Sequence, residues 1–267
     1  MEIKMLEKDK KTGKVSFLLL NSSPSFANAM RRTMVDSVPT MAIEDVEFRK
    51  NSSVLYDEIM AHRLGLMPLK SDLKSYTLPA KCKCKGEGCA RCSVKMTLKS
   101  KSTGYVYASE IKSKDSKIKP VYAKTPVVKL LKGQEVELEA TAKLGIGRDH
   151  TKWSPCLAYY KYKPVVDIDA AKCKNPEEVA ESCPVDVFEV KSGKLAVKKD
   201  NLLKCHLCGA CAEVASGNSV KLNEAEKDFV FFIEPWGQLG VKEIVAKAAD
   251  VFIESLEEFD EKVKKAE

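Results

Sequence analysis

The sequence predicts an α+β fold in which a cysteine-rich segment interrupts a larger scaffold of strands and helices. Apolar or alternating runs at 15–20, 42–49, 135–144 and 228–234 are typical of strands. Two stretches, 24–37 and 240–263, instead carry apolar residues at helical spacing. Residues 163–223 follow the order strand, short helix, hairpin, cysteine run and final strand at 219–222, which is the layout of a ferredoxin.

Composition indicates an ordinary globular protein that works in a reducing compartment. The 267 residues are 44% hydrophobic and 31% charged, and the net charge of +7 is too small to diagnose nucleic-acid binding. The charged start, 1–14, does not resemble a secretory signal, and the apolar runs 17–20 and 229–233 are too short to span a bilayer. We therefore expect a cytoplasmic protein with no membrane partner. Eight of the ten cysteines fall into two groups with metal-ligand spacing.

The first predicted helix has a clear start. Ser23 can cap it, Pro24 suits the first helical position, and Pro39 lies just beyond its end at about Ser37. Its apolar face is formed by four residues: Phe26, Ala27, Met30 and Met34. A shorter helix is expected at 59–66, and the lysine-rich segment 112–124 is expected to be exposed.

The terminal helix carries a longer apolar stripe with spacings of three and four. Its members are Val241, Val245, Ala248, Phe252, Leu256, Phe259 and Val263. This spacing suits packing against another helix. Taken alone, each helix face is expected to cover the core of this chain itself.

The motif Cys205-x2-Cys208-x2-Cys211, with Cys183 placed before a proline, predicts an iron–sulfur site. Four thiolates would hold one 4Fe–4S cluster, and three would hold a 3Fe–4S cluster if Cys183 is not a ligand. A structural zinc site is the alternative. A second ferredoxin cluster would need ligands at four positions occupied here by Cys173, Pro176, Val179 and Ala215. Only one of these is a thiol, so we expect a single cluster with a structural or redox-sensing role.

Cys82, Cys84, Cys89 and Cys92 form the second group, inside a loop at 81–93. Four thiolates within 11 residues, with Gly86 and Gly88 to turn the chain, predict a closed Zn²⁺ site. Disulfides are the alternative. Cys156 stands alone and is expected to be buried.

The sequence offers no catalytic residues that we can assign. It lacks a phosphate-binding G-x4-G-K-[ST] loop and an H-E-x-x-H motif, and Gly145-Ile-Gly147 lacks a third glycine. No aspartate cluster resembles a magnesium site. We therefore expect no active site in this chain.

Four segments together resemble a known family. They are 26–46 (FANAMRRTMVDSVPTMAIEDV), 57–69 (DEIMAHRLGLMPL), 150–155 (HTKWSP) and 232–237 (FIEPWG). These segments are similar to the D subunits of archaeal RNA polymerase, which are counterparts of bacterial alpha and of the third-largest subunit of eukaryotic RNA polymerase II. The resemblance spans nearly the whole chain.

The resemblance implies an alpha-subunit-like architecture in three parts. A discontinuous dimerisation domain would use 1–42 and 225–267. A mainly β insertion domain would occupy 43–164 and carry the zinc loop. A ferredoxin-like 4Fe–4S domain would occupy 165–224.

The resemblance also implies partners. The first and last helices would pack against subunit L through Phe26, Ala27, Met30, Met34, Val245, Phe252, Leu256 and Phe259. The heterodimer would bind small subunits N and P, nucleate assembly of the large catalytic subunits, and meet DNA only indirectly. Arg31 and Arg32 would contact a large subunit. The chain would thus be a non-catalytic subunit of a nucleotidyltransferase complex that carries out transcription.

Two alternative functions are an iron–sulfur electron-transfer subunit of an oxidoreductase and a free zinc-containing nucleic-acid-binding protein.

Overall fold

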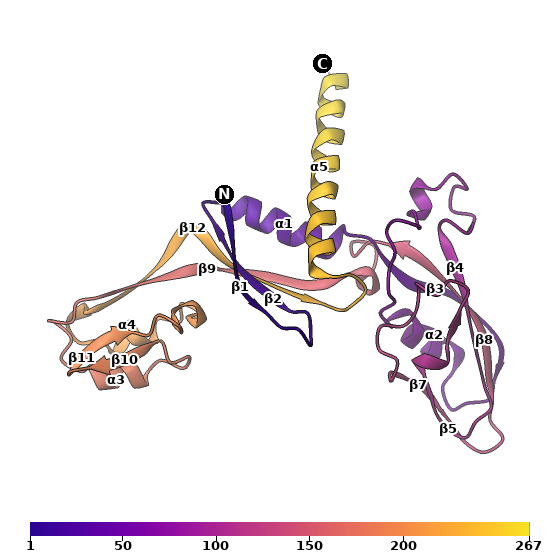
Figure 1. The fold of residues 1–267 in the computed structure, drawn as a ribbon, viewed down its shortest axis with the longest axis horizontal. Coiled ribbons are helices and arrows are strands. Elements are labelled where there is room, and N and C mark those ends of the chain that lie inside the picture. Colours follow the sequence, from indigo (N-terminus) through magenta and orange to yellow (C-terminus); the bar gives the residue numbers. More distant parts are fainter. Residues whose placement is uncertain (267) are drawn as a thin grey trace. The chain divides into compact units, whose positions relative to one another are not determined.

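Two compact units are formed by the residues that the computed structural model describes, 1–266. Unit 1 comprises 1–8, 15–29 and 159–232, and unit 2 comprises 9–14, 30–158 and the residues from 233 on. The chain therefore passes between the units several times. Figure 1 labels most of the helices and strands.

Unit 1 is built on a four-stranded sheet. Its order is β1 (Glu2–Lys8), β2 (Val15–Leu20), β12 (Val220–Pro235) and β9 (Cys156–Ile168). The first two strands form an antiparallel hairpin. Stacked rings join three of the strands, because Phe231 lies 5.3 Å from Phe17 and 5.5 Å from Tyr160 between ring centroids. This aromatic packing fixes β2, β12 and β9 against one another.

A small cysteine-bearing body completes unit 1. It contains α3 (Pro176–Glu181), an antiparallel hairpin of β10 (Phe188–Lys191) and β11 (Lys194–Val197), and α4 (Ala210–Val214). Its apolar core is formed by the buried side chains of Val179, Val187, Phe188, Leu195, Cys205, Cys211, Ala215 and Val220. Two cysteines therefore belong to the core of this body.

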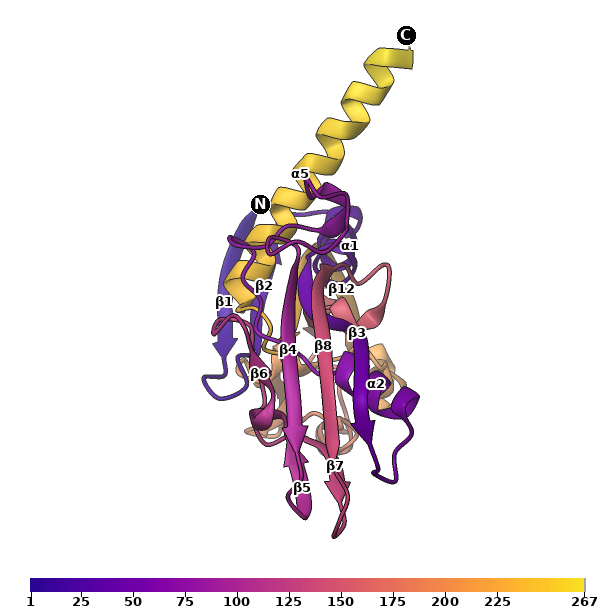
Figure 2. The same ribbon diagram turned by 90° about the vertical axis from the view of Figure 1, so that its right-hand side faces the viewer.

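Unit 2 is built on a second antiparallel sheet, with strand order β3 (Thr40–Asn51), β8 (Val136–Gly145), β4 (Ser93–Ser100) and β6 (Lys112–Ser113). Buried and more exposed residues alternate along β4 and β8, as expected of strands with one face on a core. The core face is covered in part by α2 (Asp57–Gly65), which buries Met60 and Leu64. A two-stranded sheet of β5 (Gly104–Tyr107) and β7 (Pro126–Leu130) extends the same core. Figure 2 shows β4, β8 and β3 side by side.

The two long helices have defined starts. In α1 (Pro24–Asp36), the backbone N–H of Phe26 donates to Ser23 Oγ at 3.2 Å, which is the predicted cap. Before α5 (Val241–Ala266), the N–H of Gly240 donates to the carboxylate of Glu243 at 2.9 Å. The first turns of α5 bury Ile244 and Ala248, whereas its residues from 253 to 266 are exposed.

Three sequence expectations differ from the structure. The strand at 2–8 was not expected, because all seven of its residues are exposed and leave no burial pattern. The expected strands at 219–222 and 228–234 are one continuous strand, β12, since the polar residues between them also stay extended. Segment 112–124 is anchored rather than simply exposed, because Ile118 is fully buried in the core of unit 2.

The other expected elements agree with the structure to within a few residues, except that the strand expected from 163 begins at Cys156 as β9. Among the described residues, no helix combines the length and apolar character that a membrane crossing requires.

Candidate metal centres and interaction surface

The four thiols of the loop at 82–92 occupy the corners of a small tetrahedron. Cys82 Sγ lies 3.6 Å from Cys89 Sγ and 3.5 Å from Cys84 Sγ. Cys92 Sγ lies 3.5 Å from Cys84 Sγ and 3.9 Å from Cys89 Sγ. Tetrahedral zinc with bonds of about 2.3 Å would hold its thiolates about 3.8 Å apart. The donor set therefore fits one metal ion. The disulfide alternative does not fit, since an S–S bond is about 2.05 Å long.

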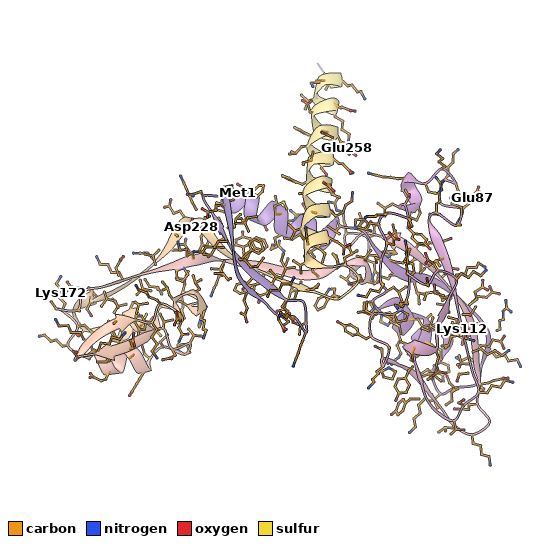
Figure 3. The ribbon with its side chains drawn as sticks, in the orientation of Figure 1. Met1, Glu87, Lys112, Lys172, Asp228 and Glu258 are labelled. Carbon is orange, nitrogen blue, oxygen red and sulfur yellow. The ribbon has the colours of Figure 1, made fainter. Side chains whose placement is uncertain are left out.

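The backbone of this loop explains its glycines. Gly86 and Gly88 have φ of +90° and +95°, and Lys85 between the ligands has φ of +51°. Glycine adopts this left-handed region without the steric penalty of a side chain. The sharp reversal lets four residues close together in sequence aim their sulfurs at one point. Figure 3 shows Glu87 on the loop that carries these thiols.

The thiols of the loop differ strongly in acidity. The backbone N–H of Cys89 lowers the pKa of Cys84 to about 5, with further help from the neighbouring thiols of Cys82 and Cys92. Burial raises the pKa of Cys92 to about 12. A cation bound by the four sulfurs would displace the protons that these thiols carry.

The second thiol group lies in the cysteine-bearing body of unit 1. Cys205 and Cys211 are buried, Cys183 is half-buried and Cys208 is exposed. Burial raises the pKa of Cys211, and the negative charges of Cys205, Cys183 and Cys208 raise it further. The fold therefore brings all four predicted ligands into one electrostatic neighbourhood.

Backbone groups in this region are aimed at sulfur. The N–H of Val187 donates to Cys183 Sγ at 3.4 Å, and the N–H of Leu207 donates to Cys205 Sγ at 3.5 Å. Leu207 and Gly209 have φ of +60° and +86°, so the chain curls between the cysteines. Such N–H···S bonds tune iron–sulfur clusters. The chemistry of the donor set thus fits a cluster whose irons each take one thiolate.

Three of the four positions that a second ferredoxin cluster would use hold apolar side chains. Val179 and Ala215 are buried members of the local core, and Pro176 is buried beside them. Cys173 packs half-buried against this core and is the one sulfur among the four positions. These four positions therefore offer a single thiol. Cys156 is buried in unit 2, as expected, and burial raises the pKa of its thiol to about 12.

The apolar stripe of α5 is uncovered over its second half. Leu256, Phe259 and Val263 are 54%, 66% and 41% exposed, spaced three and four residues apart. Val245 and Phe252, nearer the start of the helix, are half-buried. In Figure 3, Glu258 marks the part of α5 that stands clear of the rest of unit 2. An exposed stripe of this size on one helix is unusual unless another surface covers it.

The predicted interface residues on α1 divide into two groups. Phe26 and Met30 are half-buried and retain accessible surface. Ala27 and Met34 are buried, so their side chains leave no surface for a partner helix in this structure. Of the two predicted arginines, Arg32 is exposed and lies 3.9 Å from the carboxylate of Asp36, while Arg31 is half-buried.

Comparison with known proteins identifies the family. Residues 46–157 match a family described as the RNA polymerase Rpb3/RpoA insert domain. The chain is 40% identical over 260 residues to the DNA-directed RNA polymerase subunit Rpo3 of Methanosarcina acetivorans, covering 97% of this chain and 96% of that protein. Identity to Rpo3 of Archaeoglobus fulgidus is 36%, with the same coverage. Identity to RNA polymerase II subunit rpb3 of Dictyostelium discoideum is also 36%, over 90% of this chain and 88% of that protein.

The chain belongs to the Rpo3/Rpb3 family of RNA polymerase subunits. The name Rpo3 and the name D subunit denote the same archaeal subunit, so the resemblance read from the four motifs is confirmed at the level of the family. The matched insert domain lies within unit 2 and includes the whole thiol loop. The comparisons do not favour an electron-transfer subunit.

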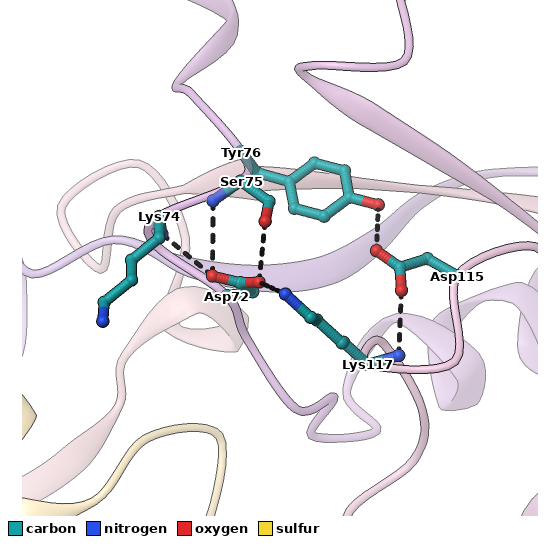
Figure 4. Close-up of polar contacts among 6 residues, drawn as sticks. All are labelled: Asp72, Lys74, Ser75, Tyr76, Asp115 and Lys117. Atoms are coloured by element: carbon teal, nitrogen blue, oxygen red, sulfur yellow. Dashed lines mark hydrogen bonds and ion pairs between the residues drawn. The ribbon is translucent and has the colours of Figure 1, made fainter.

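Sequence reasoning missed a carboxylate network that supports the approach to the thiol loop (Figure 4). The carboxylate of Asp72 accepts hydrogen bonds from Ser75 Oγ and Lys117 Nζ, both at 2.8 Å, and from the backbone N–H groups of 74–75. The hydroxyl of Tyr76 donates to the Asp115 carboxylate at 2.8 Å. These bonds tie the segment before the loop to a segment some forty residues later. The Asp-x-Lys-Ser order was the one local signal, because an aspartate often bonds N–H groups two residues ahead.

Proposed function

We propose that this chain is the non-catalytic assembly subunit of a DNA-directed RNA polymerase and acts in transcription. The single observation that carries this function is the 40% identity to Rpo3 over 97% of the chain. The match to the insert domain over 46–157 supports it independently. The chain would then contribute to nucleotidyl transfer by holding the catalytic subunits together, and it would meet DNA only through the complex.

Its first partner is subunit L, which would pack against α1 and α5. The exposed Leu256 and Phe259 support the contact with α5, and the partly accessible Phe26 and Met30 support the contact with α1. The family relationship extends the assembly to small subunits N and P and to the large catalytic subunits. The exposed Arg32 and its neighbour Arg31 would contact a large subunit. In this assignment 1–42 and 225–267 form the dimerisation domain, 43–164 the insertion domain and 165–224 the ferredoxin-like domain.

The two thiol groups would hold different metal centres. The tetrahedral spacing at 82–92 supports Zn²⁺ in the loop. The four thiols at 183, 205, 208 and 211 support one 4Fe–4S cluster, or a 3Fe–4S cluster if Cys183 is not a ligand. A cluster would supply cross-links between chain segments and a redox-active group. Both centres would brace the scaffold on which the other subunits assemble.

The function is tested at the α5 stripe, using the full chain co-expressed with subunit L of the same source. Leu256→Asp would place a charge in the proposed interface, and we expect association to weaken roughly 100-fold. Because Leu256 is 54% exposed in this chain, the substitution leaves the fold of the chain itself intact. Size-exclusion chromatography with light scattering measures the complex, and circular dichroism checks the fold.

Glu261→Lys is the matched control, since helical periodicity puts position 261 on the side of α5 opposite the stripe. It changes the charge of the same helix segment and should leave association unchanged. Normal assembly of the Leu256→Asp variant with subunit L would count against the proposed interface. Failure of the wild-type chain to co-purify with polymerase subunits would count against the function itself.

A further inference from the structure

Lys161 connects the scaffold sheet of unit 1 to the predicted cluster ligands. It lies on β9, and its half-buried side chain reaches Cys205, where Nζ donates to the backbone carbonyl oxygen at 2.7 Å. The same ammonium lies 5.9 Å from the centre of the Phe232 ring, which stacks on Tyr159 at 4.9 Å. The cation is therefore held between an aromatic face and the first cysteine of the C-x2-C-x2-C run.

The position of this cation suits a negatively charged cluster. Cys205 starts the turn that wraps the predicted cluster, and the N–H of Leu207 donates to its sulfur. One hydrogen bond from Lys161 to the Cys205 carbonyl fixes the backbone next to that sulfur. It also places the Lys161 ammonium near Cys205, a proposed cluster ligand, in a partly buried setting where charges interact more strongly than in water.

A second lysine on the same strand, Lys163, makes a different contact. Lys163 lies two residues further along β9, on the same side by strand alternation. Its Nζ pairs with the Asp228 carboxylate at 2.9 Å, and Asp228 also accepts the backbone N–H of Asn21 at 3.2 Å. Lys163 therefore joins strands of the sheet, while Lys161 joins the sheet to the cysteine loop. The pair offers an internal comparison between two half-buried lysines.

We propose that Lys161 is a positioning residue for the iron–sulfur cluster: it anchors the Cys205 turn to β9 and supplies the positive charge that faces the cluster. This inference rests on the cluster assigned under the proposed function. A nearby cation favours the more negative, reduced form of a cluster, so Lys161 raises the reduction potential. The anchored turn also slows loss of the cluster.

The test uses the full-length chain purified anaerobically as wild type, Lys161→Met, Lys161→Arg and Lys163→Met. Iron content, the rate of cluster loss to an iron chelator, and the midpoint potential from a redox titration followed by electron paramagnetic resonance are measured on each. We expect Lys161→Met to lose its cluster about tenfold faster, as outer-shell partners typically contribute, and to titrate at a more negative potential. Lys161→Arg keeps the charge, so its rate of cluster loss and its midpoint potential should stay close to those of wild type. Lys163→Met should match wild type in both.

The midpoint potential distinguishes a lysine whose charge acts on the cluster from a lysine that only packs against its neighbours. If Lys161→Met does not retain a cluster at all while Lys161→Arg and Lys163→Met do, the positioning role is supported. If Lys161→Met matches wild type in both loss rate and potential, the inference is overturned while the cluster assignment stands. A wild-type chain that contains no iron overturns the cluster assignment and this inference with it.

Discussion

Individual residues hold the segment before the thiol loop in place, and Asp72 is the clearest example. Hydrogen bonding from Lys117, and then from Ser75 and the backbone of residues 74 and 75, holds the pKa of the Asp72 carboxyl far below its usual range. An unfolded aspartate has a pKa of about 3.9. The pKa of Asp72 is therefore lower in the folded chain than in the unfolded chain. For this reason the ionised carboxylate stabilises the fold fully above about pH 4, and this stabilisation is lost as the pH falls below about 4.

Asp72→Asn should therefore lower the free energy of unfolding by about 1–2 kcal/mol at pH 7. The difference in unfolding free energy between wild type and variant should narrow as the pH falls from about 5, since the wild-type carboxyl then begins to take up protons on unfolding. Urea unfolding at a series of pH values measures this. Glu58→Gln, at an exposed carboxyl of α2, is the control. If the difference in unfolding free energy stays constant down to the lowest pH measured, the ionised carboxylate is not what stabilises the segment.

Gly145 and Gly147 allow close approach rather than an unusual backbone conformation. A Cβ at Gly145 would lie 2.4 Å from the Trp153 ring, and one at Gly147 would lie 2.2 Å from the Val35 carbonyl oxygen. These glycines let β8 and the following turn pack directly against Trp153 and the last turn of α1. The pair is thus explained by packing, and not by ligand binding.

We expect Gly147→Ala to cost about 1–3 kcal/mol, because the backbone carbonyl of Val35 has to move. Gly65→Ala is the matched control, since its Cβ would meet its nearest neighbour at an ordinary 3.5 Å. Thermal unfolding of both variants checks the difference. Equal melting temperatures for the two variants would contradict the packing explanation.

What the sequence could predict at this scale depends on distance along the chain. The thiol groups at 82–92 and 205–211 were recognisable because their cysteines lie a few residues apart, and Cys183 was added to the second group because a proline follows it. Lys161 and Cys205 are 44 residues apart, and Lys117 and Asp72 are 45 apart. No local pattern marks either contact, since each depends on how strands are arranged in a sheet. The same holds for the glycines, whose partners come from distant segments.

At the scale of elements, prediction succeeded for some regular patterns but missed β4, although buried and more exposed residues alternate along it. The strand β2 and the helix α1 combine apolar periodicity with a capping serine, so their bounds followed from local chemistry. The edge strand β1 has no buried face and therefore no signal. The apolar faces of α1 could not be divided from sequence into inward and outward residues. The structure makes that division, burying Ala27 and Met34 and leaving Phe26 and Met30 partly accessible.

We expect the order of the thiol loop to depend on the metal proposed for it. It has little apolar core of its own, whereas the following strand β4 pairs along its whole length with β8 and buries Met96 and Leu98. Removing the metal with a chelator, or replacing Cys89 by serine, should therefore increase hydrogen exchange at 82–92 by at least tenfold and leave β4 protected.

Metal analysis and hydrogen exchange with mass spectrometry measure that response. Cys156→Ala provides the control, because Cys156 is a buried thiol outside both ligand groups and its loss should leave the zinc content unchanged. Full protection of 82–92 in the chelated chain would mean that the loop is ordered without a metal.

Over the whole molecule, the two proposed metal centres belong to separate compact units with separate apolar cores. The core of unit 2 is assembled from residues between 41 and 144, and the cysteine-bearing core of unit 1 from residues between 166 and 222. Units with their own cores can open independently. Loss of one centre should then be local in its structural effect.

Cys205→Ser tests this independence in the full-length chain. Cys205 is buried in its core and is a proposed cluster ligand, so we expect the variant to lose iron and to exchange amide hydrogens faster between 173 and 222. Zinc content and protection of the β3, β8 and β4 sheet should match wild type, because no residue of that sheet contributes to the damaged core. Parallel loss of zinc, or exposure of the unit 2 sheet in this variant, would show that the two centres stabilise one cooperative structure. The cluster would then support the insert domain as well as its own body, and loss of iron would impair assembly surfaces throughout the subunit.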